Sequence, residues 1–262
     1  MKNNKLKILW LLLLTLPLFS LAQKNTKGGE YYQITVYHFV NADQQKIIDN
    51  YLKEAYLPAL HRQKINSVGV FTSISNDTAS DKRLYVVFPI KSLQVADDII
   101  ATLEKDNEYL TRGKEYSDVV YNNPAYSRKE NILLKSFPLA PAMTLPKLKG
   151  PSAERVYELR SYEGASEKIF LNKVKMFNEG GEIALFTRLN FNPVFYASVI
   201  AGSRMPNLMY MTSFENMADR DAHWKTFSAD PEWKTISGMP EYKNNVAKID
   251  ITLMRAAPYS DF

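Results

Sequence analysis

The sequence predicts an α+β protein made of two tandem ferredoxin-like βαββαβ units, whose antiparallel sheets pair with each other. Hydrophobic residues recur with the periods of strands and helices in the order β-α-β-β-α-β, and this order returns after a proline-rich segment near the middle of the chain. The two opening strands are also alike, since residues 32–37 (YQITVY) align with residues 157–162 (YELRSY). We interpret this likeness as an internal repeat of about 120 residues.

The first unit is predicted over residues 30–137. Its opening segment, residues 31–39, is rich in aromatic and β-branched residues that alternate with polar ones, which is typical of a strand. Asn41 and Gln44 have the spacing of a helix N-terminus, and apolar residues follow at helical intervals as far as Arg62. The same patterns predict strands at residues 68–74, 83–88 and 131–137 and a second helix at residues 92–110.

A linker is predicted at residues 138–152, because its four prolines interrupt any helix or central strand. The second unit then covers residues 153–258. Residues 182–188 and 195–200 are predicted as strands, or as one bent pair around Pro193. The other expected elements are strands at residues 155–162, 208–214 and 246–254 and helices at residues 167–178 and 216–227.

The first 22 residues have the pattern of a cleavable signal peptide. Three lysines precede an apolar run at residues 8–19, and Ser20-Leu21-Ala22 has the small-residue pattern of a cleavage site. The run is shorter than the roughly 20 residues that cross a bilayer as a helix, so we expect cleavage after Ala22 and no membrane span in the mature chain, with a retained N-terminal anchor as the alternative. This pattern predicts a periplasmic or secreted protein.

The composition argues against several classes of site. The chain has no cysteine, which excludes disulfides, thiolate metal sites and a cysteine nucleophile. Its formal net charge is +5, but three of the positive charges belong to the leader, and the other basic residues are interleaved with acidic ones. We therefore expect no nucleic-acid partner. With three histidines, none at i and i+4, and no phosphate-binding loop, the sequence predicts no metal and no cofactor.

The predicted units leave one face of each sheet without a cover. In a ferredoxin-like unit two helices cover one face of the sheet, and the other face needs a partner. Two units in one chain can supply that partner to each other, either by packing sheet on sheet or by closing a barrel. We therefore expect a monomeric pseudo-dimer or a homodimer.

The second half of the chain resembles the NIPSNAP family. The resemblance rests on residues 156–162 (VYELRSY), on residues 208–214 (LMYMTSF) and most specifically on residues 229–234 (ADPEWK). The first half resembles a more divergent copy that lacks the Asp-Pro-Glu-Trp string. The resemblance implies the dimeric α/β-barrel superfamily, which includes cofactor-free monooxygenases, haem enzymes and proteins of unknown activity. It supplies no agreed catalytic residues.

Strand alternation suggests a polar set of residues inside the barrel. On the opening strand of the second half, Glu158, Arg160 and Tyr162 share one face, and we expect this face to point inward because Tyr157 and Leu159 suit a helix layer. Arg160 would hold an anionic oxygen, and Glu158 or Tyr162 would move a proton. The same reasoning points Asp250 inward from the closing strand. The matching inward residues of the first half are Gln33, Thr35 and Tyr37.

These residues also have a purely structural interpretation. In that interpretation, Glu158 and Arg160 form ion pairs with Lys248 and Asp250 that fix the register of the strands. His223 is a further candidate, as a base or an axial haem ligand at the barrel mouth, against the simpler interpretation of a packing or surface residue.

Three functions remain open from the sequence. The leading hypothesis is an exported protein of undetermined activity that binds a small ligand between its two sheets. The second is a cofactor-independent oxygenase or isomerase that uses Glu158, Arg160 and Tyr162. The third is a structural or protein-interaction module with a filled interior. A pocket of about 300 Å³ or more with converging polar groups would favour the first two over the third.

Overall fold

The computed structural model describes residues 28–262, so the predicted signal peptide lies outside the described residues. The strands and helix groups of residues 28–262 follow the order βαββαβ twice, which confirms the predicted α+β class and the pair of ferredoxin-like units. The elements of the first unit are β1 (Tyr31–Phe39), α1 (Ala42–Tyr51), η1 (Leu52–Tyr56), α2 (Leu57–Arg62), β2 (Gly69–Ser73), η2 (Ile74–Asp77), β3 (Lys82–Ile90), α3 (Leu93–Leu103), α4 (Asn107–Arg112), α5 (Lys114–Ser117) and β4 (Arg128–Ser136). Those of the second unit are β5 (Val156–Glu163), α6 (Glu167–Asn178), α7 (Glu182–Arg188), β6 (Pro193–Ala201), β7 (Asn207–Phe214), α8 (Met217–Ala229), α9 (Pro231–Gly238), η3 (Pro240–Tyr242) and β8 (Lys248–Ala256).

The eight strands form one closed antiparallel barrel in the order β1-β3-β2-β8-β5-β7-β6-β4. Each unit contributes four adjacent strands, and the two units join at two seams, where β2 pairs with β8 and β4 pairs with β6. Along these seams a closed barrel leaves no strand edge exposed. Of the two arrangements that the sequence left open, the barrel is therefore the one observed.

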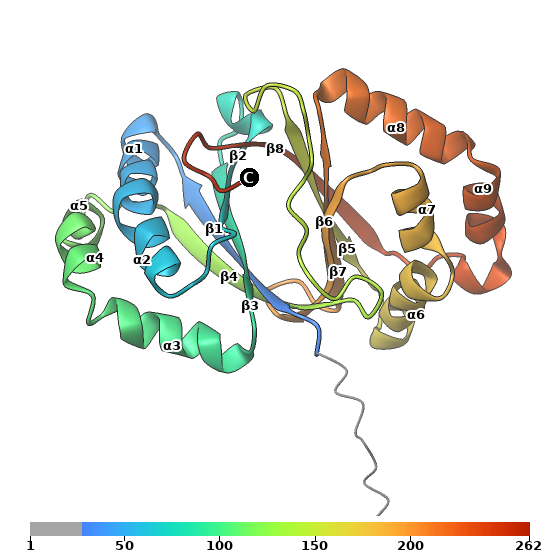
Figure 1. Ribbon diagram of the computed structural model, residues 1–262, viewed down its shortest axis with the longest axis horizontal. Helices are drawn as coiled ribbons and strands as arrows, with labels where there is room; N and C mark the ends of the chain where they lie inside the picture. The colour runs from blue at the N-terminus through green and yellow to red at the C-terminus, as the bar shows by residue number, and fades with distance from the viewer. Residues whose placement is uncertain (1–27) are drawn as a thin grey trace, which may run out of the picture.

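The helices cover the barrel from opposite sides. Helices α1 to α5 lie against the sheet of the first unit, and α6 to α9 lie against the sheet of the second, so the molecule has three layers with the barrel in the middle (Figure 1). Polar residues begin several helices: Asn41 Oδ1 accepts a hydrogen bond from Gln44 N at 2.9 Å, and Asn216 Oδ1 accepts one from Asp219 N at 3.0 Å. These side chains fix the start of α1 and α8 by satisfying free backbone N–H groups.

The interior of the barrel is filled mainly by apolar side chains, which overturns the predicted facing of two strands. A small barrel must fill its interior with side chains at close-packed density. Buried apolar residues from both units meet there: Tyr32, Ile34, Val36, Phe71, Tyr85, Val87, Leu134, Tyr157, Leu159, Val194, Phe195, Ala197, Val199, Met209, Met211 and Met254. The polar residues of β1 and β5 alternate with this set and therefore face the helices.

One predicted strand is a helix. Residues 182–188 form α7, whereas the sequence pattern had suggested a strand. A short apolar run such as Ile183–Phe186 has no periodicity that separates a strand from one turn of helix. The deciding feature is tertiary, because Leu185 and Phe186 pack in the core between the helices and the sheet.

Within residues 28–262, no helix has the length and apolar character that crossing a membrane requires.

The linker between β4 and β5 contains no helix or strand, and it stays close to the barrel. Phe137 N and Thr144 N donate to backbone carbonyls of β6, those of Tyr196 and Val194, at 2.9 Å each. The connection is therefore part of the packed structure.

Candidate functional site

A cleft of about 530 Å³ lies between the helices and the sheet of the second unit. Strands β5 and β7 form its floor, and α6, α7, α8 and α9 supply its walls. Its volume exceeds the roughly 300 Å³ that small-molecule sites usually require. The lining residues are Arg160, Tyr162, Lys173, Met176, Glu182, Phe186, Tyr210, Arg220, Trp224, Phe227, Ser228, Trp233, Ser237, Tyr242, Asn245, Val246 and Ile249.

Glu158 lies beneath the cleft and organises its cationic groups. Its side chain is fully buried, and four N–H donors from three residues converge on its carboxylate, the longest being Arg220 Nη2 to Oε1 at 3.3 Å. Arg160 Nε donates to Oε1 at 2.6 Å, Arg220 Nε donates to Oε2 at 2.7 Å, and Trp224 Nε1 donates to Oε2 at 2.9 Å. Arg220 and Trp224 are one helical turn apart on α8, so they project from the same face of that helix.

The donors determine the ionisation of Glu158. Burial by itself raises the pKa of this carboxyl, but the hydrogen bond from Arg220 and the charge of Arg160 lower it below its ordinary value. Glu158 is therefore an ionised counter-ion at neutral pH. A carboxylate engaged in this way has the features of a positioning residue, since it fixes two guanidinium groups at the edge of the cleft.

Arg160 has one side of its guanidinium available to the cleft. Its Nε is bound to Glu158, and its Nη1 donates to the hydroxyl of Tyr162 at 3.1 Å. The guanidinium carbon also lies 3.7 Å from the ring centroid of Trp224, a stacking arrangement that suits arginine. Within residues 28–262, Nη2 has no hydrogen-bond acceptor. A fixed and stacked guanidinium with a free donor is well suited to bind an anion.

A buried ion pair forms the opposite wall. Lys173 Nζ lies 2.7 Å from Glu182 Oε2, and the two side chains are only 6% and 3% exposed. Burial raises the pKa of Glu182, and the charge of Lys173 partly opposes this rise. The ammonium of Lys173 also lies 4.7 Å from the ring centroid of Phe177. A carboxyl group whose pKa is raised is a candidate proton acceptor in a cleft of this kind.

The lining of the cleft combines excess positive charge with aromatic rings. Arg160, Arg220 and Lys173 line it, while Glu182 is the single carboxylate on its surface. The rings of Trp224, Phe227 and Trp233 lie in sequence along α8 and α9, with centroid separations of 5.4 and 4.5 Å. The arrangement can therefore hold an anionic group at one end and an apolar or aromatic body at the other.

The structure brings together three of the residues singled out from the sequence. Glu158, Arg160 and Tyr162 form one connected group, but on the helix side of the sheet and outside the barrel. The ion pairs expected with Lys248 and Asp250 of β8 are wrong as well. Glu158 pairs with its strand neighbour Arg160 and with Arg220 of α8.

The other candidates lie elsewhere. Gln33, Thr35 and Tyr37 were expected to point inward, yet Tyr37 packs in the helix layer of the first unit, and the alternation of β1 places the other two on the same side. Asp250 does point into the barrel, at its open end, where it pairs with Arg204. His223 Nδ1 lies 2.8 Å from the carbonyl of Asp219, and its ring packs against Phe191 and Phe214 outside the lining of the cleft.

Among residues 28–262, no group of three or more His, Asp or Glu side chains is placed to hold a metal ion.

Sequence reasoning missed several members of the site. Arg220, Lys173 and Glu182 drew no attention because each stands in a helix or run without a motif. The i, i+4 spacing of Arg220 and Trp224 was a usable signal, since it places a cation and an aromatic ring on one helical face. Lys173 and Glu182 carried no such signal, because their pairing depends on how α6 and α7 pack together.

Comparisons with known proteins agree with this fold. Residues 157–261 match the family model described as NIPSNAP, so the second half of the chain is a NIPSNAP domain. No curated protein sequence matches the chain. The chain is similar in fold to a crystal structure described as a putative monooxygenase from Lactobacillus acidophilus, with 12% identity, a TM-score of 0.55 and coverage of 87% of this chain and 94% of the other.

Two further structures show the same likeness. A putative monooxygenase from Fusobacterium nucleatum has 8% identity and a TM-score of 0.54, and the match covers 87% of this chain and 93% of that one. A protein described as anthrone oxidase-like has 9% identity and a TM-score of 0.52, and the match covers 87% of this chain and 92% of that one. At these identities the likeness establishes the fold, which extends over both units.

Proposed function

Starting from a chain whose second half is a NIPSNAP domain, we propose that this domain binds a small anionic molecule with an aromatic or apolar body in its helix–sheet cleft. The observation that carries the proposal is the guanidinium of Arg160, which is stacked on Trp224, held by Glu158 and left with a free donor at the cleft. This site replaces the space between the sheets as the main ligand site.

The donors around the cleft favour an anion over a cation. Arg160 and Arg220 share Glu158, Asp221 pairs with Arg220 Nη1 at 2.9 Å, and Glu182 neutralises Lys173, so the group left to bind an anion is the unused donor of Arg160. Arginine recognises carboxylates through two parallel donors, and the low exposure of Arg160, 12% for its side chain, reduces the screening of its charge by water.

The proposal is tested by calorimetric titration with 2-naphthoate and with 2-naphthylmethanol, which has the same ring without the charge. We expect 2-naphthoate to bind at least ~10-fold more tightly, because a charge-assisted hydrogen bond contributes about 1.5–3 kcal/mol. Arg160→Gln should remove this preference. Arg188→Gln is the matched control, since Arg188 belongs to the same unit, pairs with Asp230 and Glu232, and does not line the cleft.

Equal affinity for the two probes would contradict the proposal, and so would an Arg160→Gln protein that keeps the preference for 2-naphthoate. If neither probe binds while the protein remains folded, the third function, a structural or interaction module, becomes the better explanation.

A second candidate function is a cofactor-independent oxygenase or isomerase at the same cleft. It is favoured by Glu182, whose raised pKa and position on the cleft surface suit the removal of a proton from a bound carbon acid. Fold relatives described as putative monooxygenases are compatible with this chemistry. The test substrate is 2-tetralone, a ketone with enolisable C–H bonds: NMR measures solvent deuterium exchange into it, and an oxygen electrode measures oxygen uptake. Exchange or oxygen uptake that Glu182→Gln abolishes would support it, and none in the wild type would exclude it for that substrate.

We further propose that the protein acts outside the cytoplasm, on the basis of the leader pattern of residues 1–22. N-terminal sequencing of the protein from its own host is the test. A mature chain that begins at Gln23 supports export, and an intact Met1 contradicts it.

A further inference from the structure

Strand β8 is longer than the seam that joins it to β2. Strand β2 ends at Ser73, whose partner on β8 is Met254. On its other side β8 pairs with β5 as far as Lys248. Within residues 28–262, residues 248–253 therefore have a paired strand on one side only. We call the unpaired side of residues 248–253 the β8 edge.

Backbone N–H and C=O groups point out of the β8 edge at alternate residues. Ala257 N donates to Val70 O at 2.8 Å, so the backbone groups of Ala257 point towards β2. Because these groups alternate in direction along a strand, those of Leu253, Ile251 and Ile249 point to the same side. Ile249 and Ile251 thus each offer an N–H and a C=O to a further strand.

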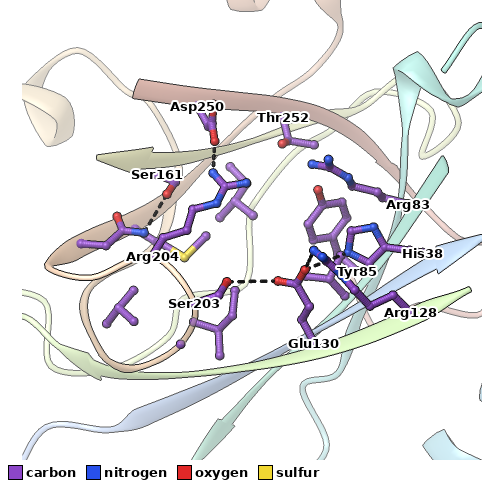
Figure 2. Close-up of a pocket in the computed structure, with 17 residues that line it drawn as sticks. His38, Arg83, Tyr85, Arg128, Glu130, Ser161, Ser203, Arg204, Asp250 and Thr252 are labelled. Carbon is purple, nitrogen blue, oxygen red and sulfur yellow. Dashed lines mark hydrogen bonds and ion pairs between the residues drawn. The ribbon is translucent and has the colours of Figure 1, made fainter. Parts of the chain in front are cut away.

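The side chains of the β8 edge divide into a polar inner face and an apolar outer face. Asp250 and Thr252 point into the open end of the barrel (Figure 2), and strand alternation places Lys248 on the same face. Ile249 and Ile251 point outward and are 49% and 47% exposed. Exposed apolar side chains beside unpaired backbone groups are the features with which a sheet accepts another strand.

The β8 edge is complementary to itself about a two-fold axis at Ile249. Two copies of one strand that are related by such an axis run antiparallel, and directly opposite residues lie on the same face. An axis at Ile249 sets the two Ile249 side chains opposite each other and Lys248 opposite Asp250 of the second copy, and both contacts are favourable. An axis at Asp250 would instead set two carboxylates opposite each other. An axis at Ile251 would meet residues 73–81, which line a groove together with Ile251.

Both charged groups of this register are able to take a further partner. Lys248 Nζ lies 3.9 Å from Glu163 Oε1, a long ion pair, and the lysine side chain is 60% exposed. Asp250 pairs with Arg204, yet 39% of the Asp250 side chain remains exposed. A carboxylate has two oxygens and can accept hydrogen bonds from an arginine and a lysine together.

We propose that the protein forms a two-fold symmetric homodimer in which the β8 edges of two copies pair around Ile249. The two β8 strands join the sheets of the two barrels across the axis. Ile249 also lines the helix–sheet cleft, so the second copy brings its own Ile249 next to that cleft. The dimer forms without a ligand and does not depend on the function proposed for the cleft.

The chain has no cysteine, so a single engineered cysteine reports the pairing through disulfide formation. Ile249→Cys lies on the axis, where opposite Cα atoms are about 5.5 Å apart and within the range of a disulfide. Ile251→Cys is the matched control, because it has nearly the same exposure and outward direction but lies about 14 Å from its own copy. Under mild oxidation we expect Ile249→Cys to form a covalent dimer at least ~10-fold faster than Ile251→Cys.

Sedimentation equilibrium of the protein without any cysteine is the second measurement. Lys248→Glu sets a carboxylate opposite Asp250 of the second copy, so we expect it to weaken the dimer about 10-fold. Lys225→Glu makes the same charge change at an exposed position of α8 and should leave the dimer unchanged. A wild-type protein that stays monomeric at about 100 μM, equal oxidation of the two cysteine variants, or an equally stable dimer in Lys248→Glu would each overturn the proposal.

Discussion

The helix layers of the two units differ although their strands follow the same order. In the first unit, Tyr37 packs against Tyr116 and Tyr126, with ring centroids 6.3 and 6.0 Å apart, and tyrosine rings fill the space between the helices and the sheet. In the second unit, the aligned Tyr162 hydrogen-bonds to Arg160 and faces a cleft of about 530 Å³. One unit thus uses this space for packing, while the other leaves it open and charged.

The difference begins at two aligned positions on the opening strands. Gln33 and Thr35 of the first unit align with Glu158 and Arg160 of the second. Thr35 donates to Asn131, a neutral interaction within the sheet, at 2.8 Å. Burying a charge is costly unless partners satisfy it, and the second unit supplies those partners from α8. We interpret this network as one that positions Arg160 and Arg220 for a function.

The largest effect is expected from removing the buried carboxylate. Glu158→Gln should lower the free energy of unfolding by about 3–5 kcal/mol, because it removes the fully buried carboxylate shared by the half-buried guanidinium groups of Arg160 and Arg220 and leaves Arg160 without a counter-ion. The aligned change Gln33→Ala in the first unit should cost less than about 1 kcal/mol, since Gln33 makes one weak hydrogen bond of 3.4 Å to Thr35. Urea denaturation of both variants measures the contrast, and equal losses would remove the basis of the comparison.

The same carboxylate should also give the second unit its sensitivity to acid. The folded-state pKa of Glu158 is lowered, so its contribution to stability is present above its unfolded pKa of about 4.5 and is lost as the pH falls through the lower folded pKa. Glu158→Gln should therefore show a flatter dependence of stability on pH below 4.5 than the wild type. Denaturation midpoints of the wild type and of Glu158→Gln, measured at about four pH values between pH 3 and pH 7, test this. Parallel curves would contradict it.

The second-largest effect concerns the ion pair of α6 and α7. Lys173→Met should destabilise the protein by about 3 kcal/mol at neutral pH, because Glu182 remains buried without its partner. Burial raises the pKa of Glu182, and removing Lys173 should raise it further, so protonation relieves the unpaired charge and the loss should shrink as the pH falls through the folded-state pKa. The double variant Lys173→Met with Glu182→Leu should recover most of the stability. A loss that does not depend on pH would argue against an ionised Glu182.

A smaller effect is expected from opening the first unit. Tyr116 stacks on Tyr51 with a centroid separation of 3.8 Å, and Tyr116→Ala should cost about 2 kcal/mol through the space that it leaves. The sheet supplies only Lys129 near the new space, its Nζ 5.7 Å from the ring centroid of Tyr37, and no stacked arginine, so 2-naphthoate should bind there more weakly than in the cleft. Binding of 2-naphthoate to this variant at a second site, as tightly as in the cleft, would show that an open helix layer is sufficient and that the charges of the second unit are not required.

The smallest effect is expected at the rim of the second unit. Arg188 is 50% exposed and pairs with Asp230 and Glu232, within the Asp-Pro-Glu-Trp string. Arg188→Ala should change the free energy of unfolding by less than about 1 kcal/mol, because exposed ion pairs contribute little. A larger loss in thermal denaturation would mean that this string supports the whole helix layer.

Much of this fold could be predicted from the sequence, because strand and helix periods are local properties. Both βαββαβ units were predicted, and α7 was the element assigned to the wrong class, since a short apolar run is ambiguous in periodicity. The facing of β5 was wrong for a different reason. Tyr157 and Leu159 were assigned to the helix layer because they are apolar, but the barrel interior is the more apolar of the two environments.

Only part of the candidate site could be predicted from the sequence. Glu158, Arg160 and Tyr162 were found, because alternating charged and aromatic residues on a strand are unusual. Arg220, Lys173 and Glu182 were not found, because their place in the site depends on the packing of α6, α7 and α8 against the sheet. The unpaired edge of β8 is likewise a property of the folded structure and leaves no mark in the sequence.

The most direct test of the account is a crystal structure of the protein soaked with 6-bromo-2-naphthoate, in which anomalous scattering locates the bromine. The account predicts a carboxylate within hydrogen-bond distance of Arg160 Nη2 and a bromine peak among the aromatic rings of α8 and α9. A peak beside the tyrosines of the first unit, or density for the probe away from Arg160, would contradict it.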